Sequence, residues 1–200
     1  KHSPYLLCMA VQVPQKIIIS DQMLRSWVRC RRKAWLDKYG DTQQKIWSAH
    51  STLQINHQEK SFASFLQEKR PSSGIKSCQE GKSFIHHLKI KCKTNSGQLI
   101  EGSPSLLQKT NGFSQWGDFS YRPVICRQGH RITREHKFLL SFTGLLLTNL
   151  QKSPATEGIV LSQNKNKLEI QTINLTQILE QNLIDALPKI SKDIGSLKPP

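Results

Sequence analysis

The sequence predicts an α/β (α+β) domain in which helices flank a central mixed sheet. Two observations predict it. Of the 200 residues, 36% are hydrophobic and 22% charged, which suits one folded domain and not a disordered chain. Helix-like and strand-like segments also follow one another in the order α-α-β-β-β-α-β-β-α. We expect an N-terminal arm over 1–16 and the folded domain over 17–200.

The first helix is expected over about residues 22–38. Ser20 and Asp21 offer its N-cap, and it should end before Gly40. Its apolar face carries residues at 3.6-residue spacing, namely Met23, Trp27, Cys30 and Ala34. A second helix is expected over about 43–69, before the helix-breaking sequence RPSSG.

The remaining elements are read from apolar runs and turn signals. Residues 75–85 are ambiguous between helix and loop. Strands are expected over 84–92, 98–109, 119–126, 158–162 and 167–173, with helices over about 134–150 and 175–194.

The net charge of +15 and the pI near 9.9 favour a polyanionic partner. Neutralising phosphates releases counterions, so nucleic acid is the expected partner, with DNA favoured. The longest apolar run, Phe138–Leu150, is too short to span a bilayer. We therefore expect a cytoplasmic protein that does not associate with a membrane. Oligomeric state is not predicted.

Basic residues gather on the first helix: Arg25, Arg29, Arg31, Arg32 and Lys33. The guanidinium group of arginine can donate two hydrogen bonds to one phosphate, so the basic face of this helix is expected to contact a nucleic-acid backbone. The alternative is that the charges only keep the helix soluble.

Most familiar chemical motifs are missing from the sequence. It contains no phosphate-binding loop, dinucleotide fingerprint or zinc spacing, and its five scattered cysteines are expected to be mostly reduced thiols. His86 and His87 are adjacent, and on a strand they would point to opposite faces, which argues against a shared metal.

Four segments in order resemble the RecB-like branch of the PD-(D/E)xK nuclease superfamily. They are RCRRKAWLDKYGD (29–41), GSPSLL (102–107), GDFSYRPVICRQG (117–129) and LLLTNLQKSP (145–154). More closely, the sequence resembles cyanobacterial RecB-like nucleases related to CRISPR-associated RecB-like exonucleases. It implies a restriction-endonuclease-like fold and a Mg²⁺- or Mn²⁺-dependent nuclease site.

The resemblance also assigns site positions. His57, with His50 as a rival, matches the family's histidine. Ser105 stands where the family has an aspartate, Ile125 where it has the strand acid, Arg127 where it has lysine, and Lys137 where it has glutamine.

These departures predict a lost metal site, because serine is a poor ligand for a hard dication and isoleucine is none. Arg127 and Lys137, with Arg131 and Arg134 nearby, would suit an anion instead. Two alternatives stay open. Glu101 or Asp118 could supply displaced carboxylates, or the segment could be a plain buried strand.

Several relatives hold a [4Fe–4S] cluster with one cysteine on the early helix and three near the C-terminus. Cys30 matches the first, and the family's C-terminal cysteine segment is absent from this chain. The alternative for Cys30 is a cysteine of the core.

The expected function is therefore that of a catalytically degenerate RecB-like nuclease fold, a pseudoenzyme that binds nucleic acid through a basic surface. One alternative is an active metal-dependent DNA exonuclease or endonuclease. The other is a structural protein–protein interaction module.

Overall fold

The computed structural model describes residues 17–41, 43, 60, 62–128, 131–164 and 167–200. The expected N-terminal arm, most of the expected helix over 43–69, and the candidate residue His57 lie outside the described residues. Within them, none of the helices is long and apolar enough to cross a bilayer.

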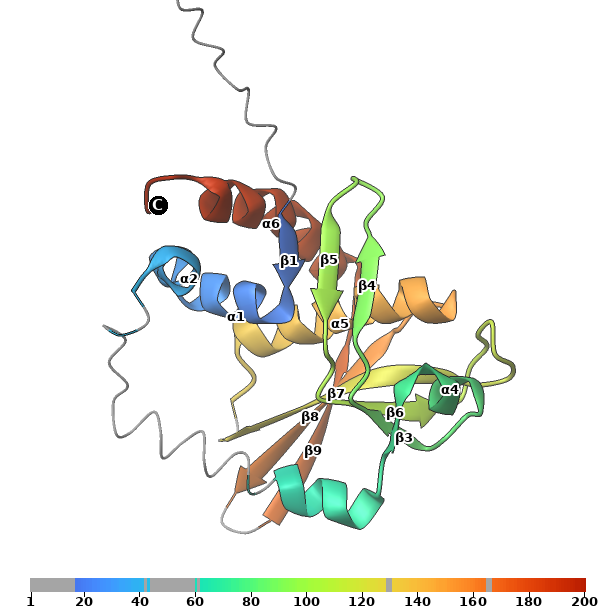
Figure 1. The fold of residues 1–200 in the computed structure, drawn as a ribbon. Coiled ribbons are helices and arrows are strands. Elements are labelled where there is room, and N and C mark those ends of the chain that lie inside the picture. The colour runs from blue at the N-terminus through green and yellow to red at the C-terminus, as the bar shows by residue number, and fades with distance from the viewer. Residues whose placement is uncertain (1–16, 42, 44–59, 61, 129–130, 165–166) are drawn as a thin grey trace, which may run out of the picture.

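The chain folds as a mixed α/β protein, but its strands form two sheets where the sequence predicted one (Figure 1). The larger sheet has the order β2-β3-β6-β7-β8-β9. Its strands are β2 (Ser72–Ser73), β3 (Phe84–His86), β6 (Leu106–Thr110), β7 (Ser120–Gln128), β8 (Glu157–Asn164) and β9 (Lys167–Asn174). The smaller sheet has the order β1-β5-β4. Its strands are β1 (Ile18–Ser20), β5 (Leu99–Gly102) and β4 (Ile90–Lys93).

Two expected strands are divided between these sheets. The segment 84–92 breaks after β3, where His87 has a φ of 48°, a left-handed conformation that does not continue a strand. The segment 98–109 breaks between β5 and β6, at residues 103–105. Each break lets one expected strand segment contribute a strand to both sheets, which the alternation of residues alone does not reveal.

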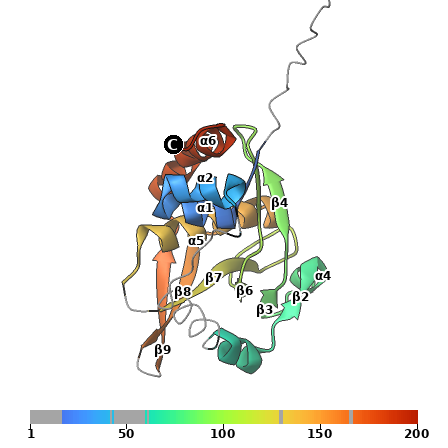
Figure 2. The same ribbon diagram turned by 60° about the vertical axis from the view of Figure 1, so that its left-hand side comes forward.

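Helix α5 (Arg134–Gln151) connects the parallel strands β7 and β8 and lies between the two sheets (Figures 1 and 2). Its Leu140 packs on Gly158 of β8, and its Leu146 packs on Gly102 of β5. A Cβ added at either glycine would lie 2.8 Å from the leucine side chain. The glycines therefore let both sheets approach the helix closely.

The first expected helix is in fact two, α1 (Asp21–Arg29) and α2 (Arg31–Tyr39). The predicted N-cap is confirmed, because the Ser20 hydroxyl accepts a hydrogen bond from the Met23 amide at 3.1 Å. The break falls at Cys30, which is extended with φ −162° and ψ 119°.

Contacts with α6 (Gln177–Gly195) explain the break between α1 and α2. On α2, Trp35 donates a hydrogen bond to the Ser196 carbonyl at 2.8 Å, and Tyr39 donates one to the Ile194 carbonyl at 2.9 Å. A change of direction at Cys30 lets α2 reach the end of α6, while α1 stays packed on α5.

The second face of the larger sheet is covered by the helix over 62–69, whose Phe65 packs with Leu106, Val124 and Leu161. The short helix α4 (Gly74–Gln79) resolves the ambiguous segment 75–85 as helix followed by β3.

Candidate nucleic-acid interface

The strand pairing brings two of the predicted site positions together. Leu106 of β6 pairs with Val124 of β7 in antiparallel register, so the next residues, Ser105 and Ile125, stand opposite each other. Ser105 is exposed in the turn before β6. Ile125 is 9% exposed and packs with Leu140 and Val160 under α5.

Arg127 lies two residues further along β7, on the same face as Ile125. It is only 4% exposed, which is unusual for an arginine. One guanidinium nitrogen, Nη1, donates a hydrogen bond to the Arg131 carbonyl. The other two nitrogens, Nε and Nη2, are buried and have no hydrogen-bond partner within the described residues.

Two residues that the sequence did not single out lie beside Arg127 across the neighbouring strands of the sheet. In the strand register, Arg127 of β7 pairs with Ser162 of β8, and Ser162 pairs with Glu169 of β9. The buried Ser162 hydroxyl has no hydrogen-bond partner in the described part of the chain. Burial lowers the pKa of Arg127, and the charge of Glu169 opposes that shift. The sequence alone could not predict that Arg127, Ser162 and Glu169 lie next to one another, because their proximity depends on the register of β7, β8 and β9.

Three other predicted cations surround the beginning of α5. Arg131 precedes the helix, and Arg134 and Lys137 lie in its first turns, all exposed. The Arg134 guanidinium lies 5.0 Å from the centre of the Phe138 ring, a cation–π contact that holds it against the helix.

His136 caps the same helix. Thr133 and His136 form a capping box, in which the Thr133 amide donates to His136 Nδ1 at 3.1 Å. Burial lowers the pKa of His136, and the nearby charge of Arg127 lowers it further. An Nδ1 atom that accepts the amide hydrogen carries no proton of its own, so His136 serves the cap as a neutral acceptor.

Most of the basic side chains predicted to bind nucleic acid from the first helix form ion pairs with carboxylates of the protein itself. Arg29 binds Glu135 through two hydrogen bonds of 2.6 and 2.9 Å, and Arg25 lies 3.5 Å from the same carboxylate. Arg31 binds Asp193 and Lys33 binds Asp37, each at 2.6 Å. Arg32 is exposed and forms no ion pair with a described residue. Part of the positive charge expected here is thus balanced internally.

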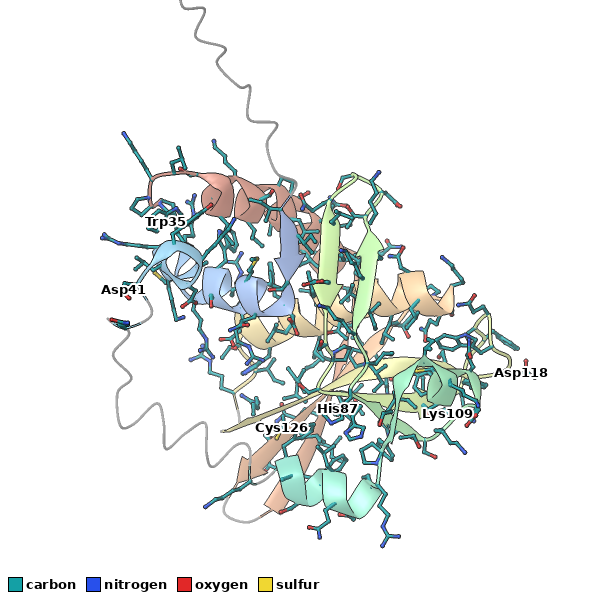
Figure 3. The ribbon with its side chains drawn as sticks, viewed as in Figure 1. Trp35, Asp41, His87, Lys109, Asp118 and Cys126 are labelled. Atoms are coloured by element: carbon teal, nitrogen blue, oxygen red, sulfur yellow. The ribbon has the colours of Figure 1, made fainter. Side chains whose placement is uncertain are left out.

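The carboxylates considered as substitutes lie elsewhere. Glu101 is on β5 of the smaller sheet, 3.4 Å from Lys89. Asp118 precedes β7 and lies at the opposite end of that strand from Cys126 (Figure 3). The described residues contain no group of three or more metal-ligating side chains. With a buried apolar residue at 125 and a buried cation at 127, the described positions do not fit Mg²⁺ or Mn²⁺.

The described cysteines do not fit an iron–sulfur cluster either. Cys30 is exposed at the α1–α2 break, so the alternative of a core cysteine is wrong. The others, Cys78, Cys92 and Cys126, lie on α4, β4 and β7. Burial raises the pKa of the Cys78 thiol to about 11, which keeps it protonated and unreactive.

His86 and His87 do not point to opposite faces of a strand, as the sequence predicted they would. The His87 backbone is in the left-handed region, and the two rings lie with their centres 4.0 Å apart and their planes tilted by 48°. Among the described residues they belong to no group of three or more metal-ligating side chains.

No family model matches the chain, and no curated protein matches it by sequence. The fold is similar to that in the crystal structure of SSO0001, with a TM-score of 0.54 and 12% sequence identity. The match covers 90% of this chain and 79% of SSO0001. At that identity the likeness shows the fold alone, a mixed α/β arrangement shared by both proteins.

Proposed function

We propose that this protein binds nucleic acid through the cationic end of α5, on a RecB-like nuclease fold that has lost its metal site. The observation that carries the proposal is Arg127. A buried guanidinium, two of whose nitrogens have no hydrogen-bond partner among the described residues, occupies the strand position where the family has its lysine, beside an isoleucine at the acid position. Such a site favours an anion over a cation.

The surrounding surface supports the same reading. Around the beginning of α5, the exposed residues Arg131, Arg134 and Lys137 form no ion pair with any described residue. The helix N-terminus adds a positive potential there. Nucleic acid supplies the matching charge, and the net charge of +15 supports its approach from solution. We name this set of three residues the α5 cationic surface.

The test is binding of labelled single- and double-stranded DNA in Mg²⁺, over about 50 to 200 mM salt. We expect binding without cleavage. Replacing Arg131, Arg134 and Lys137 by alanine should reduce the slope of log K against log salt by about 2 to 3, because each lost phosphate contact removes about 0.7–0.9.

A matched control removes three exposed lysines elsewhere, with Lys76, Lys91 and Lys93 changed to alanine. Both variants lose the same net charge. An equal effect of the two would mean that binding follows overall charge and would overturn the assignment to α5. Metal-dependent cleavage by the unaltered chain would overturn the loss of the metal site.

A further inference from the structure

A pocket of about 630 Å³ opens beside the α5 cationic surface. The first turns of α5, the end of β9 and the first turns of α6 form its walls. The lining residues are Ile132, Arg134, Lys137, Phe138, Thr172, Ile173, Asn174, Thr176, Ile178, Leu179 and Asn182. Its volume lies in the range of about 300–1,000 Å³ that small-molecule sites occupy.

The charges of the lining favour an anion. Arg134 and Lys137 are its charged members, and no lining residue is acidic. The contact of Arg134 with the Phe138 ring fixes that guanidinium at the wall. Two long helices, α5 with 18 residues and α6 with 19, begin at this pocket, so the positive ends of both helix dipoles add to its potential.

The rest of the lining is suited to a planar ring with polar edges. Asn174 and Asn182 offer amide donors and acceptors, the groups that recognise base edges. Ile178 is 76% exposed at the pocket, which is high for a large aliphatic side chain and leaves apolar surface for a ring to cover. Cationic, amide and apolar groups thus converge on one concavity.

We propose that this pocket binds a single nucleotide unit, with the phosphate held by Arg134 and Lys137 and the base against Ile178 and the two asparagines. The inference deepens the proposed function, on which it rests, because it makes the pocket the place where one unit of the nucleic acid is held. The remainder of the strand would lie over the α5 cationic surface.

The probes are a deoxynucleoside 5′-monophosphate, the nucleoside without phosphate, and inorganic phosphate, titrated into the full chain and followed by NMR chemical shifts. We expect the monophosphate to bind at least about tenfold more tightly than either fragment, since it uses both halves of the pocket. A short oligonucleotide tests whether the unit can be bound within a strand.

Two variants block the pocket without removing a cation. Asn182→Phe places a phenyl group at the wall, and its control is Gln181→Phe, one residue away and outside the lining. Ile178→Glu adds a negative charge, and its control is Ile170→Glu on β9, where the wild-type isoleucine is 63% exposed. Each pocket variant should weaken the monophosphate about tenfold or more, and each control should leave it unchanged.

The outcomes separate the two proposals. Monophosphate binding that the pocket variants do not weaken, or no monophosphate binding at all, overturns the inference. If the variants still bind long DNA as the wild type does, the proposed function survives that failure. Monophosphate binding in the pocket without any binding of DNA overturns the proposed function and leaves a mononucleotide site.

Discussion

Arg127 on β7 and Ser162 on β8 are paired in the parallel register of their strands, and both carry buried polar atoms without hydrogen-bond partners among the described residues. Two such residues side by side are unfavourable for folding, because Nε and Nη2 of Arg127 and the Ser162 hydroxyl are out of water without a hydrogen bond to any described residue. A binding role for Arg127 and a purely structural one therefore predict opposite effects of mutation.

Replacing Arg127 by methionine should leave stability unchanged or raise it by up to about 2 kcal/mol, because an apolar side chain of similar length avoids desolvating a charge. The same variant should bind DNA more weakly. Urea unfolding and DNA titration of the same preparation measure both effects. A clear loss of stability would contradict the prediction and identify Arg127 as a structural residue whose bond to the Arg131 carbonyl matters.

Two buried serines provide a matched comparison. Ser162 has no partner within the described chain, whereas Ser26 donates a hydrogen bond to Asp37 at 2.6 Å. We expect Ser162→Ala to be neutral or stabilising by up to about 1 kcal/mol, and Ser26→Ala to cost about 1 kcal/mol. Chemical denaturation measures both. Equal losses for the two would show that the Ser162 hydroxyl is satisfied in solution, for example by water.

These contrasts also show how far the sequence could predict the structure. Helix α5, expected over about 134–150, was predicted closely because it is a long and mostly apolar segment. The break at Cys30 was not predicted. It depends on contacts of Trp35 and Tyr39 with the end of α6, about 160 residues away in the chain.

The candidate site likewise has features that the sequence predicts and features that depend on tertiary structure. Ser105, Ile125 and Arg127 were predicted as site positions from the order of motifs, and the register places the first two opposite each other. The pocket could not be found from the sequence, since α5, β9 and α6 contribute its lining. The pairing of the basic helix residues with Glu135 and Asp193 likewise depends on tertiary packing.

Asp193 joins α6 to the first two helices. Its carboxylate accepts two hydrogen bonds of 2.6 Å from Arg31 and one of 2.7 Å from Trp27 Nε1. The hydrogen bond from Arg31 is the main cause that holds the pKa of Asp193 below its ordinary value. We expect Asp193→Asn to lower Tm by about 2–6 °C near neutral pH.

The pH dependence of that loss follows from the sign of the shift. Because the folded pKa is depressed, the contribution of Asp193 is present above its unfolded pKa of about 3.9 and disappears as the pH falls through the folded value. Thermal scans of both proteins should therefore converge in acid. Asp185→Asn, which alters an exposed carboxylate of α6 bonded to Gln181, is the control. A difference in Tm that persists undiminished below both pKa values would contradict the assignment.

His136 gives a second pH effect, in a different range. Its Nδ1 accepts the Thr133 amide, and its pKa is lowered by burial and then by Arg127, with Arg25 and Arg29 adding to the shift and Glu135 opposing it. Between the folded pKa and the unfolded value of about 6.5, only the unfolded chain binds the proton. Stability should therefore fall as the pH drops from about 7 through this window.

Glutamine is the informative replacement, because it suits the same position of a capping box and cannot titrate there. We expect His136→Gln to match the wild-type Tm within about 2 °C at pH 8 and to exceed it as the pH approaches 5, since protonation weakens only the wild-type cap. His136→Ala, which removes the acceptor, should be less stable than glutamine at every pH. Parallel pH profiles for wild type and His136→Gln would show that the imidazole is not titrating in the folded cap, and the neutral-acceptor role would have to be abandoned.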